Sequence, residues 1–388
     1  MAEFLFWFGV VVVVYTYLGY PVLITVLTLG KKGYQARAEA EGFEPSVSLI
    51  ISAWNEADWI RQKARNTQEI DYPADKIQVI FMTDGSDDDT PDILKNEFPQ
   101  FETYHKPGRS GKIAAMERGV TFAKTPILIF SDANTILNTE VVRNIVKHYA
   151  DANIGGVAGE KRIIMEQEEA ASGAGEGIYW KYESYLKDRD YAFHSVVGAA
   201  GELFSVRRDL FENVEPDTLL DDFIISLRVA GKGFRVAYAP DAYASERPSA
   251  DTEAEMTRKV RISAGGIQSI VRLRYLLNPF GRFKLWFQYI SHRVLRWTLA
   301  PLMLPVILLA NIGLAVEGDI FYVALLALQL AFYAASILGY LLEKKKIKLK
   351  VLFVPFYFSM MNVSVYLGFL RYIRGQQSVN WARAKRAT

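Results

Sequence analysis

The sequence contains no cysteine among its 388 residues. This absence excludes disulfide bonds, thiolate-bound zinc or iron–sulfur centres, and a cysteine nucleophile. A strong excess of charge of one sign is also missing, because 45 Lys and Arg residues face 43 Asp and Glu residues. Net charge therefore does not indicate a nucleic-acid partner, and we expect none.

The common glycine-rich nucleotide-binding signatures are absent as well. GAGEG at 173–177 has the wrong spacing for a dinucleotide-binding fingerprint and follows no expected strand, and the Gly-Lys-Ser/Thr of a phosphate-binding loop does not occur. The acidic run TDGSDDDT at 83–90 lacks the ligand spacing of an EF-hand loop. We therefore expect neither of those nucleotide folds nor an EF-hand calcium site.

The sequence does contain long apolar segments, in line with a content of 51% hydrophobic residues. Phe4–Leu29 runs for 26 residues without a charge, which exceeds the length needed to cross a bilayer. Its leader MAEF lacks the positive charge of a signal peptide, so we expect a retained transmembrane helix. Three later segments are long enough to span: Trp297–Val316, Ile320–Leu342 and Val351–Leu370.

Basic residues that flank these segments predict the orientation of the chain. Lys31 follows the first segment and Lys344 follows the third, so the positive-inside rule directs region 31–296 to the cytoplasm. Three later crossings would carry the basic tail to the outside. Alternatively, Val351–Leu370 is re-entrant or interfacial, and the tail stays inside.

Region 280–297 mixes aromatic and aliphatic residues with cations and directly precedes an expected span. This pattern predicts an amphipathic helix that lies in the membrane interface, with its cations on lipid phosphates. These cations are Arg282, Lys284, Arg293 and Arg296. An ordinary surface helix of the soluble domain is the alternative.

Between residues 46 and 240, short apolar runs alternate with helical patterns. This alternation predicts an α/β domain with a mostly parallel sheet covered by helices. In such sheets, ligands bind beyond the carboxyl ends of the strands. Asp84 and Asp132 each end an apolar run, so both carboxylates are candidate ligand-binding groups, although an Asp after a strand often only begins a turn.

Several motifs occur in a fixed order. They are SLIISAWNEADWI, DYPADKIQVIFMTDGSDDDT, GRSGKIAAMERGV, ILIFSDANT and LLDDFIISLRVAGKGFRVAYAP, together with GEGIYWKYESYLK and GAAGELFSVRRDLF. Over about 43–300 the chain resembles membrane-embedded family 2 glycosyltransferases, the group that includes cellulose, chitin and hyaluronan synthases. The resemblance implies an α/β GT-A domain, which is a Rossmann-like nucleotide-diphospho-sugar transferase fold, together with transmembrane α-helices.

The expected organisation has five parts. They are an N-terminal transmembrane helix (1–30), a cytoplasmic GT-A domain (31–279), an amphipathic interface helix (280–297), a C-terminal transmembrane region of two to three helices (298–372) and a basic tail (373–388). We expect an integral membrane protein of a bacterial inner or plasma membrane, with membrane lipid as a partner.

The resemblance also implies roles for individual residues. Asp132 would bind Mg²⁺ or Mn²⁺, with Asn134 in place of the second acidic ligand of the Asp-x-Asp motif. Asp222 would be the catalytic base, although a carboxylate at the start of a helix can also be only a cap. The implied donor-binding residues are Ala53, Asn55, Glu56, Asp84, Lys112 and Arg261, and the implied acceptor-side residues are Gly201, Glu202 and Asp221.

The predicted activity is inverting transfer of a hexosyl group from a nucleoside-diphosphate sugar, with UDP expected, to a saccharide or lipid-linked acceptor in polysaccharide or glycoconjugate biosynthesis. Polymerising members carry Gln-x-x-Arg-Trp, whereas this chain has Arg258-Lys-Val-Arg261-Ile262. An aliphatic Ile262 offers no ring face to a sugar, which favours short products over processive synthesis. A processive synthase remains an alternative, as do a nucleotidyltransferase and a noncatalytic membrane binding module.

Overall fold

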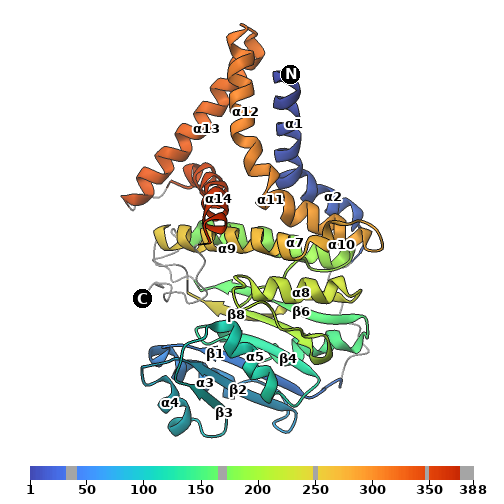
Figure 1. The fold of residues 1–388 in the computed structure, drawn as a ribbon, viewed down its shortest axis with the longest axis vertical. Coiled ribbons are helices and arrows are strands. Elements are labelled where there is room, and N and C mark those ends of the chain that lie inside the picture. The colour runs from blue at the N-terminus through green and yellow to red at the C-terminus, as the bar shows by residue number, and fades with distance from the viewer. Residues whose placement is uncertain (32–41, 165–172, 248–251, 346–348, 376–388) are drawn as a thin grey trace.

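The computed structural model describes residues 1–31, 42–164, 173–247, 252–345 and 349–375. Figure 1 shows an α/β domain built on one sheet, and long helices that extend from one side of it. The N-terminus lies at the far end of these helices, beside the turn between α12 and α13. The predicted basic tail lies outside the described residues from 376 onward.

One mixed sheet forms the centre of the domain. Its strands are β1 (Val47–Ala53), β2 (Ile77–Asp84), β3 (Glu102–Lys106), β4 (Ile127–Asp132), β5 (Ile136–Leu137), β6 (Ile154–Ile163), β7 (Leu203–Arg207) and β8 (Arg235–Glu246). Their spatial order is β3-β2-β1-β4-β7-β6-β8-β5. Strands β3, β2, β1 and β4 are mutually parallel, as the sequence predicts.

Strand β7 departs from the predicted parallel arrangement, because it pairs antiparallel with both β4 and β6. Its register sets Leu203, where β7 begins, opposite Ser131, near the carboxyl end of β4. The loop that precedes β7 therefore reaches the edge where ligands bind in sheets of this kind. A parallel β7 would have carried residues 198–202 to the opposite edge.

Helices cover both faces of the sheet. In the α/β domain they are α3 (Ala57–Gln68), α4 (Thr90–Glu97), α5 (Lys112–Phe122), α6 (Val141–Val146), α8 (Asp221–Gly231) and the short 3-10 helices η3 (Lys147–Ala150) and η4 (Arg208–Leu210). Because side chains alternate along each strand, Ile50 and Leu128 pack in one apolar cluster, whereas Leu49 and Ile129 pack in another. At Gly119 of α5, an added Cβ would lie 2.6 Å from Ile50 Cγ2, so only glycine allows this close approach to β1.

Two long helices lie between the sheet domain and the apolar helices, α7 (Gly173–Phe193) and α9 (Thr252–Arg272). Beyond them, the chain continues through η5 (Arg274–Leu277), α10 (Phe283–Gln288), the π-helix η6 (Tyr289–Val294) and α11 (Leu295–Trp297). The helical segments of 283–297 correspond to the predicted interface helix.

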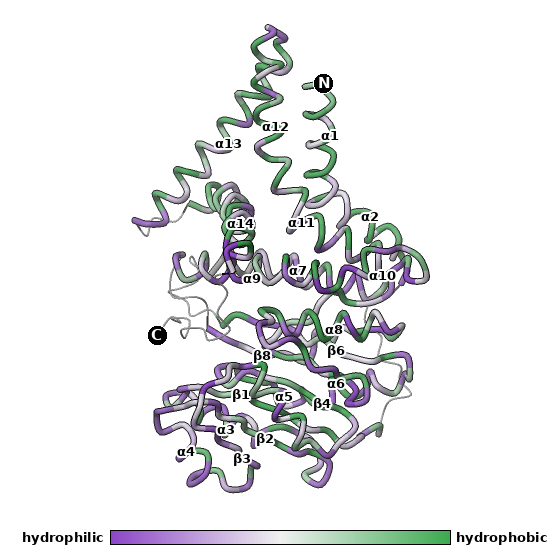
Figure 2. The backbone as a smooth tube through the Cα atoms, in the orientation of Figure 1, coloured by the Kyte–Doolittle hydropathy of each residue, from purple (hydrophilic) through white to green (hydrophobic). Residues whose placement is uncertain are grey.

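Four helical segments of the described chain are long and apolar enough to cross a membrane. The first combines α1 (Ala2–Val14), the π-helix η1 (Tyr15–Gly19) and α2 (Tyr20–Leu27), and the others are α12 (Leu299–Val316), α13 (Ile320–Lys344) and α14 (Lys350–Ile373). Figure 2 shows that hydrophobic residues dominate these helices. Helices α1 and α12 pack closely, since a Cβ at Gly9 would lie 2.7 Å from Ile307 Cγ1.

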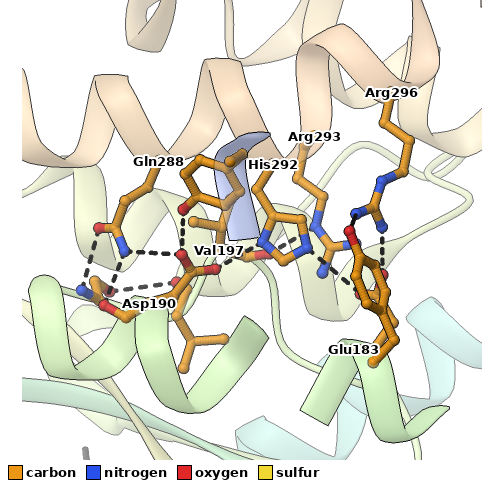
Figure 3. A network of polar contacts seen from close by, with 11 residues as sticks. Glu183, Asp190, Val197, Gln288, His292, Arg293 and Arg296 are labelled. Atoms are coloured by element: carbon orange, nitrogen blue, oxygen red, sulfur yellow. Dashed lines mark hydrogen bonds and ion pairs between the residues drawn. The ribbon is translucent and has the colours of Figure 1, made fainter. Parts of the chain in front are cut away.

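The predicted role of two interface-helix cations is wrong. Arg293 and Arg296 are buried, and both donate hydrogen bonds to the carboxylate of Glu183 on α7, at 3.0 Å for Arg293 Nη1 (Figure 3). A buried carboxylate on the facing helix needs compensating charge, so these guanidinium groups bind Glu183 in place of lipid phosphates. Burial alone would raise the pKa of Glu183, but Arg293 and Arg296 outweigh it and hold that pKa well below its usual range.

A second buried carboxylate, Asp190, joins three segments of the chain in the same network (Figure 3). Gln288 Nε2 donates to its Oδ1 at 3.2 Å, and His292 Nδ1 lies 2.6 Å from its Oδ2. Tyr20 Oη of α2 also donates to Asp190. The first apolar helix, α7 and the 283–297 helix are therefore connected through buried polar contacts.

Replacement of Glu183 by Gln would leave two buried guanidinium groups without their counter-charge. We expect Glu183→Gln to destabilise the protein by ~3–5 kcal/mol, as measured by denaturant unfolding in detergent. Glu97→Gln is the matched control, because Glu97 pairs with Arg61 on the surface, and it should leave the midpoint nearly unchanged. Equal shifts for both variants would contradict the structural role of Glu183.

Candidate active site

The candidate site lies at the edge where β1, β2 and β4 end and β7 begins. Ala53, Asp84 and Asp132 are the last residues of β1, β2 and β4. The parallel register sets Ala53 opposite Thr83 and Ser52 opposite Asp132, so the three strand ends are adjacent. The structure therefore brings the two predicted strand-end carboxylates to one edge.

The predicted donor-side residues that follow β1 form a loop connected to the loop after β2. Asn55 adopts a left-handed backbone conformation, with φ of 52°. Its side chain donates to Asp87 Oδ1 at 2.5 Å and accepts from the Asp87 amide at 3.0 Å. The amide of Glu56 donates to Thr90 Oγ1 at 2.8 Å. These bonds hold the two loops together at the ligand edge, and Ala53 is buried beneath them.

Asp84 is buried and supports the turn that leads into α5. Its Oδ2 accepts hydrogen bonds from the amides of Ser110 and Gly111, at 2.6 and 2.7 Å. The neighbouring Gly85 has a positive φ of 67°, and a Cβ there would lie 2.5 Å from Arg109 Cβ. Only glycine fits at this position. Asp84 thus orients the turn before Lys112, which is a structural role in addition to the donor binding that the resemblance implies.

Lys112 begins α5 and projects into the centre of the site. Its Nζ lies 2.5 Å from Asp132 Oδ1 and donates to the carbonyl of Gly201 at 3.4 Å. Burial lowers the pKa of Lys112, but Asp132 and Asp221 outweigh burial and hold it above its usual value. Lys112 therefore carries a fixed positive charge between the β4 and β7 ends.

Lys63, which the sequence analysis did not identify, supports the Asp132 turn from beneath. Its buried Nζ donates at 2.9 Å to both Ser131 Oγ and the Thr135 carbonyl, on either side of Asp132 and Asn134. Thr135 Oγ1 in turn donates to the Asp132 carbonyl at 2.9 Å. A lysine in a largely polar amphipathic helix carries no sequence signal of burial, so only the structure reveals this role.

Asp221 and Asp222 occupy the first turn of α8, on the other side of the site. A Cβ built on Gly201 would lie 3.4 Å from Asp222 Oδ2 and 3.5 Å from Lys112 Nζ, so all three residues meet at one point. Burial raises the pKa of Asp222 to about 7, with a further rise from Asp221 and an opposing effect of Lys112. This carboxylate can therefore exchange a proton near neutral pH.

A cavity of about 200 Å³ connects these residues with α7, α9 and α11. Predicted residues that line it are Lys112, Asp132, Gly201, Glu202, Asp221, Asp222 and Arg261. Ala53, Asn55, Glu56, Asp84 and Asn134 do not line it. Asn134 is half-buried in the turn after β4.

The cavity has an aromatic side that the sequence analysis missed. Tyr179 and Trp180 of α7 and Trp297 of α11 line it, as does Ile262, the residue at the position of the missing tryptophan. The absence of an aromatic at 262 therefore does not leave the cavity without one. The string GEGIYWKYESYLK contained this signal, but only packing assigns its aromatic side chains to the cavity.

Glu202 belongs to a buried cluster of ion pairs beside the cavity. Lys161 Nζ lies 2.6 Å from its Oε1, and Arg258 Nη2 lies 3.7 Å away. Burial would raise the pKa of Glu202, but Lys161 and Arg258 outweigh burial and hold it well below its usual value. Glu202 is therefore ionised at neutral pH and is a poor candidate for an alternative base to Asp222.

Among the residues that the structure describes, no group of three His, Asp or Glu side chains is arranged to hold a metal ion. Asp132 is the one carboxylate ligand of the predicted metal pair, and Asn134 adds a neutral oxygen two residues later. A divalent cation fits these residues only if a bound diphosphate and water complete its coordination.

Comparison with known proteins identifies the class of this domain. Residues 48–215 match the family model described as glycosyl transferase family 2. The chain is 28% identical over 238 residues to the glycosyltransferase AglD of Haloferax volcanii, which covers 58% of this chain and 36% of that protein. It is 25% identical over 236 residues to a beta-monoglucosyldiacylglycerol synthase of Synechocystis, and this match covers 58% of this chain and 48% of that protein. The matched region thus spans a third to a half of these relatives.

A solved structure has the same fold over nearly the whole chain. It is the mannosyltransferase PcManGT from Pyrobaculum calidifontis in complex with GDP-Man and Mn²⁺, with a TM-score of 0.72 and 19% identity. The match covers 96% of this chain and 100% of that one. Residues 48–215 therefore form a glycosyl transferase family 2 domain by the family model, and the solved structure shows the GT-A fold, as predicted from the sequence.

Lys63 generates a prediction about stability. Lys63→Met should destabilise the protein by ~1–3 kcal/mol, because the Ser131 and Thr135 oxygens lose a buried donor. Thr135→Val removes one acceptor, so Lys63→Met should cost less in that background. Denaturant unfolding of the two single variants and the double variant measures this coupling. Strict additivity, or an equal effect of Lys95→Met on the exposed face of α4, would refute it.

Proposed function

We propose that the protein is an inverting glycosyltransferase that moves a sugar from a nucleoside-diphosphate sugar to a lipid-linked acceptor at the cytoplasmic face of a membrane. The observation that carries the proposal is the meeting of Lys112, Asp132 and Asp222 in one cavity that extends toward the apolar helices. A cation that can neutralise a diphosphate and a carboxylate that can accept a proton therefore lie around one space. The bond between the sugar and the diphosphate would break there.

The donor end of the site needs positive charge, because a diphosphate leaves as an anion. Asp132 and Asn134 would hold Mg²⁺ or Mn²⁺, which supplies neutralisation of the leaving diphosphate. Lys112 adds a fixed positive charge beside Asp132, and Arg261 adds a second cation in the cavity wall. The similar mannosyltransferase was solved with Mn²⁺ and GDP-Man, so GDP competes with the expected UDP as the nucleotide.

Asp222 is the proposed general base. It would accept the proton of the acceptor hydroxyl as that oxygen attacks the anomeric carbon, while the diphosphate leaves from the opposite face and the configuration inverts. Burial and, to a smaller extent, Asp221 beside it keep the pKa of Asp222 above that of an ordinary carboxyl. Donor phosphates near Lys112 would raise the pKa of Asp222 further, because they would offset the positive charge of Lys112 that lowers it.

The acceptor end supports a lipid-linked substrate that carries a sugar. Tyr179, Trp180 and Trp297 line this end with aromatic rings, on which a sugar can stack. These residues come from α7 and from the helix that leads into α12, so this end of the cavity faces the membrane side. One relative is a beta-monoglucosyldiacylglycerol synthase, a name that also refers to a lipid product.

Processive synthesis is the second candidate within this class. The replacement of the tryptophan by Ile262 favours addition of one or a few sugars, whereas Trp180 and Tyr179 could serve a growing chain instead. Trp180 already has Lys161 Nζ 4.9 Å from its ring centroid. That contact affects a single acceptor sugar and a growing chain alike, so the replacement at 262 is the argument for short products.

The pH dependence of transfer provides a test of Asp222. A base must be ionised, so the rate should rise with pH up to about 7 and then level off, and it should fall as Asp222 becomes protonated at lower pH. Asp222→Asn should lower kcat by ~10²–10⁴-fold with little change in donor affinity. Normal turnover of this variant would exclude Asp222, and Asp221→Asn would then be measured.

The reaction itself is tested with purified protein, radiolabelled UDP-sugars and GDP-mannose, and extracted membrane lipids. We expect release of the matching nucleoside diphosphate and transfer of label into the chloroform phase. Excess chelator should stop both, and Mn²⁺ or Mg²⁺ should restore them. Release of pyrophosphate would instead indicate a nucleotidyltransferase, and a label of high molecular weight would indicate a processive synthase.

Two variants serve as controls for the metal. Asp132→Ala should abolish transfer, whereas Asn134→Ala should reduce it less, because only Asp132 contributes a negative charge. Full transfer in excess chelator, or equal losses for both variants, would refute a metal bound through Asp132. Donor binding without turnover in the wild type, under every lipid tested, would favour a noncatalytic binding module.

A further inference from the structure

We infer that α14 lies in the plane of the membrane surface, with one face on the catalytic domain and the other on lipid, and that three of the four long apolar segments in the described residues cross the bilayer. This inference concerns membrane topology and does not depend on the proposed reaction. It differs from what length and composition indicate, because α14 satisfies both criteria for a span.

The first argument is that α14 runs alongside α9. Tyr357 Oη donates to Glu255 Oε1 at 3.4 Å, near the start of α9. Eleven residues later, a Cβ at Gly368 would lie 2.7 Å from the amide nitrogen of Ala264 and 3.0 Å from the Val260 carbonyl. Eleven residues of helix advance by ~16 Å, so α14 stays beside α9 for about half the thickness of a bilayer core.

Helix α9 itself is bound to the catalytic domain. A Cβ at Gly265 would lie 2.7 Å from Leu220 Cγ, and Gln268 Oε1 accepts a hydrogen bond from the Leu219 amide at 3.0 Å. Arg261 of α9 lines the cavity. Because α14 runs alongside α9, it lies along the surface of the catalytic domain and does not extend toward the bilayer centre.

The second argument concerns the points at which the spanning helices meet the domain. Tyr17 Oη, in η1 just after α1, donates to Asn362 Oδ1 of α14 at 2.8 Å. Tyr366 Oη, one turn further along α14, donates to the carbonyl of Pro301 in the first turn of α12 at 2.5 Å. Asn362 and Tyr366 of α14 thus contact the end of the α1–η1 segment and the start of α12, both on the side of the catalytic domain.

The lengths of the other apolar helices are sufficient to cross a bilayer in whose core α14 does not lie. Helix α12 has 18 residues, or ~27 Å, and α1 packs against it. Helix α13 has 25 residues and returns the chain, since its Gly339 lies against Leu352 and Phe356 at the start of α14. A chain that crosses in α1 with η1 (Ala2–Gly19, ~27 Å), in α12 and in α13 finishes on the side of the catalytic domain. This resolves the odd number of late crossings that the sequence predicts.

Lipid is the proposed occupant of the outer face of α14. Val351, Val363, Leu370 and Ile373 are exposed by 84%, 45%, 46% and 63%, and helical spacing directs them away from the α9 side. An exposed apolar face of this kind requires a cover. Helices α12 and α13 also expose apolar side chains, and the exposed Arg374 at the end of α14 suits lipid headgroups.

The absence of cysteine makes a direct test possible. Single variants Val351→Cys, Val363→Cys and Ile373→Cys are labelled with a nitroxide in proteoliposomes. The ratio of the nitroxide's accessibility to oxygen and to a nickel complex reports its depth in the bilayer. An in-plane helix predicts one similar, shallow depth for all three. A spanning helix predicts that residue 363 is deeper than the other two by ~15 Å, which would overturn the inference.

Helix α13 provides the matched control. Val323→Cys, Leu330→Cys and Ile337→Cys are exposed positions on a helix that we infer to cross, and residue 330 should be the deepest. In sealed vesicles, an impermeant maleimide should label Arg374→Cys together with Glu97→Cys of the catalytic domain, and Gly318→Cys from the opposite side. Labelling of Arg374→Cys together with Gly318→Cys would show that α14 crosses.

Discussion

The carboxylate of Glu183, buried between Arg293 and Arg296, is the constraint on which the architecture depends. It joins α7, which carries the aromatic side of the cavity, to the helix that leads into α12. Asp190 extends the same network to Tyr20 of the first apolar helix. Buried charges tolerate little displacement once paired, so these contacts fix the membrane helices relative to the catalytic residues.

Opposite charges also lie close together at the centre of the site. Lys112 faces Asp132 and lies close to Asp222, and Asp221 adds a further carboxylate beside Asp222. Burial and the charge of Asp221 outweigh the opposing effect of Lys112 and raise the pKa of Asp222 to about 7. A diphosphate and a cation would redistribute this charge, and donor binding is therefore coupled electrostatically to the proposed base.

Sequence reasoning named several of the residues that line the cavity, for a physical reason. Asp132 and Asp222 belong to contiguous motifs, in which a strand end or a helix start fixes the position of the side chain. Trp180, Lys63 and Arg258 have no such local signal, because each acquires its role through contacts with residues far away in the chain. The interface cations were misassigned for the same reason, since their partner Glu183 lies 110 residues from Arg293.

The sequence by itself determined the family, the α/β class, the apolar helices and the strand-end carboxylates, because these follow from periodicity, length and local motifs. Only the tertiary structure decided that β7 runs antiparallel to β4 and so brings Gly201 to Lys112 and Asp222. Only it showed that α14 follows α9. Hydropathy measures whether a segment tolerates lipid, whereas its direction depends on the partner against which it packs, and that partner is distant in the chain.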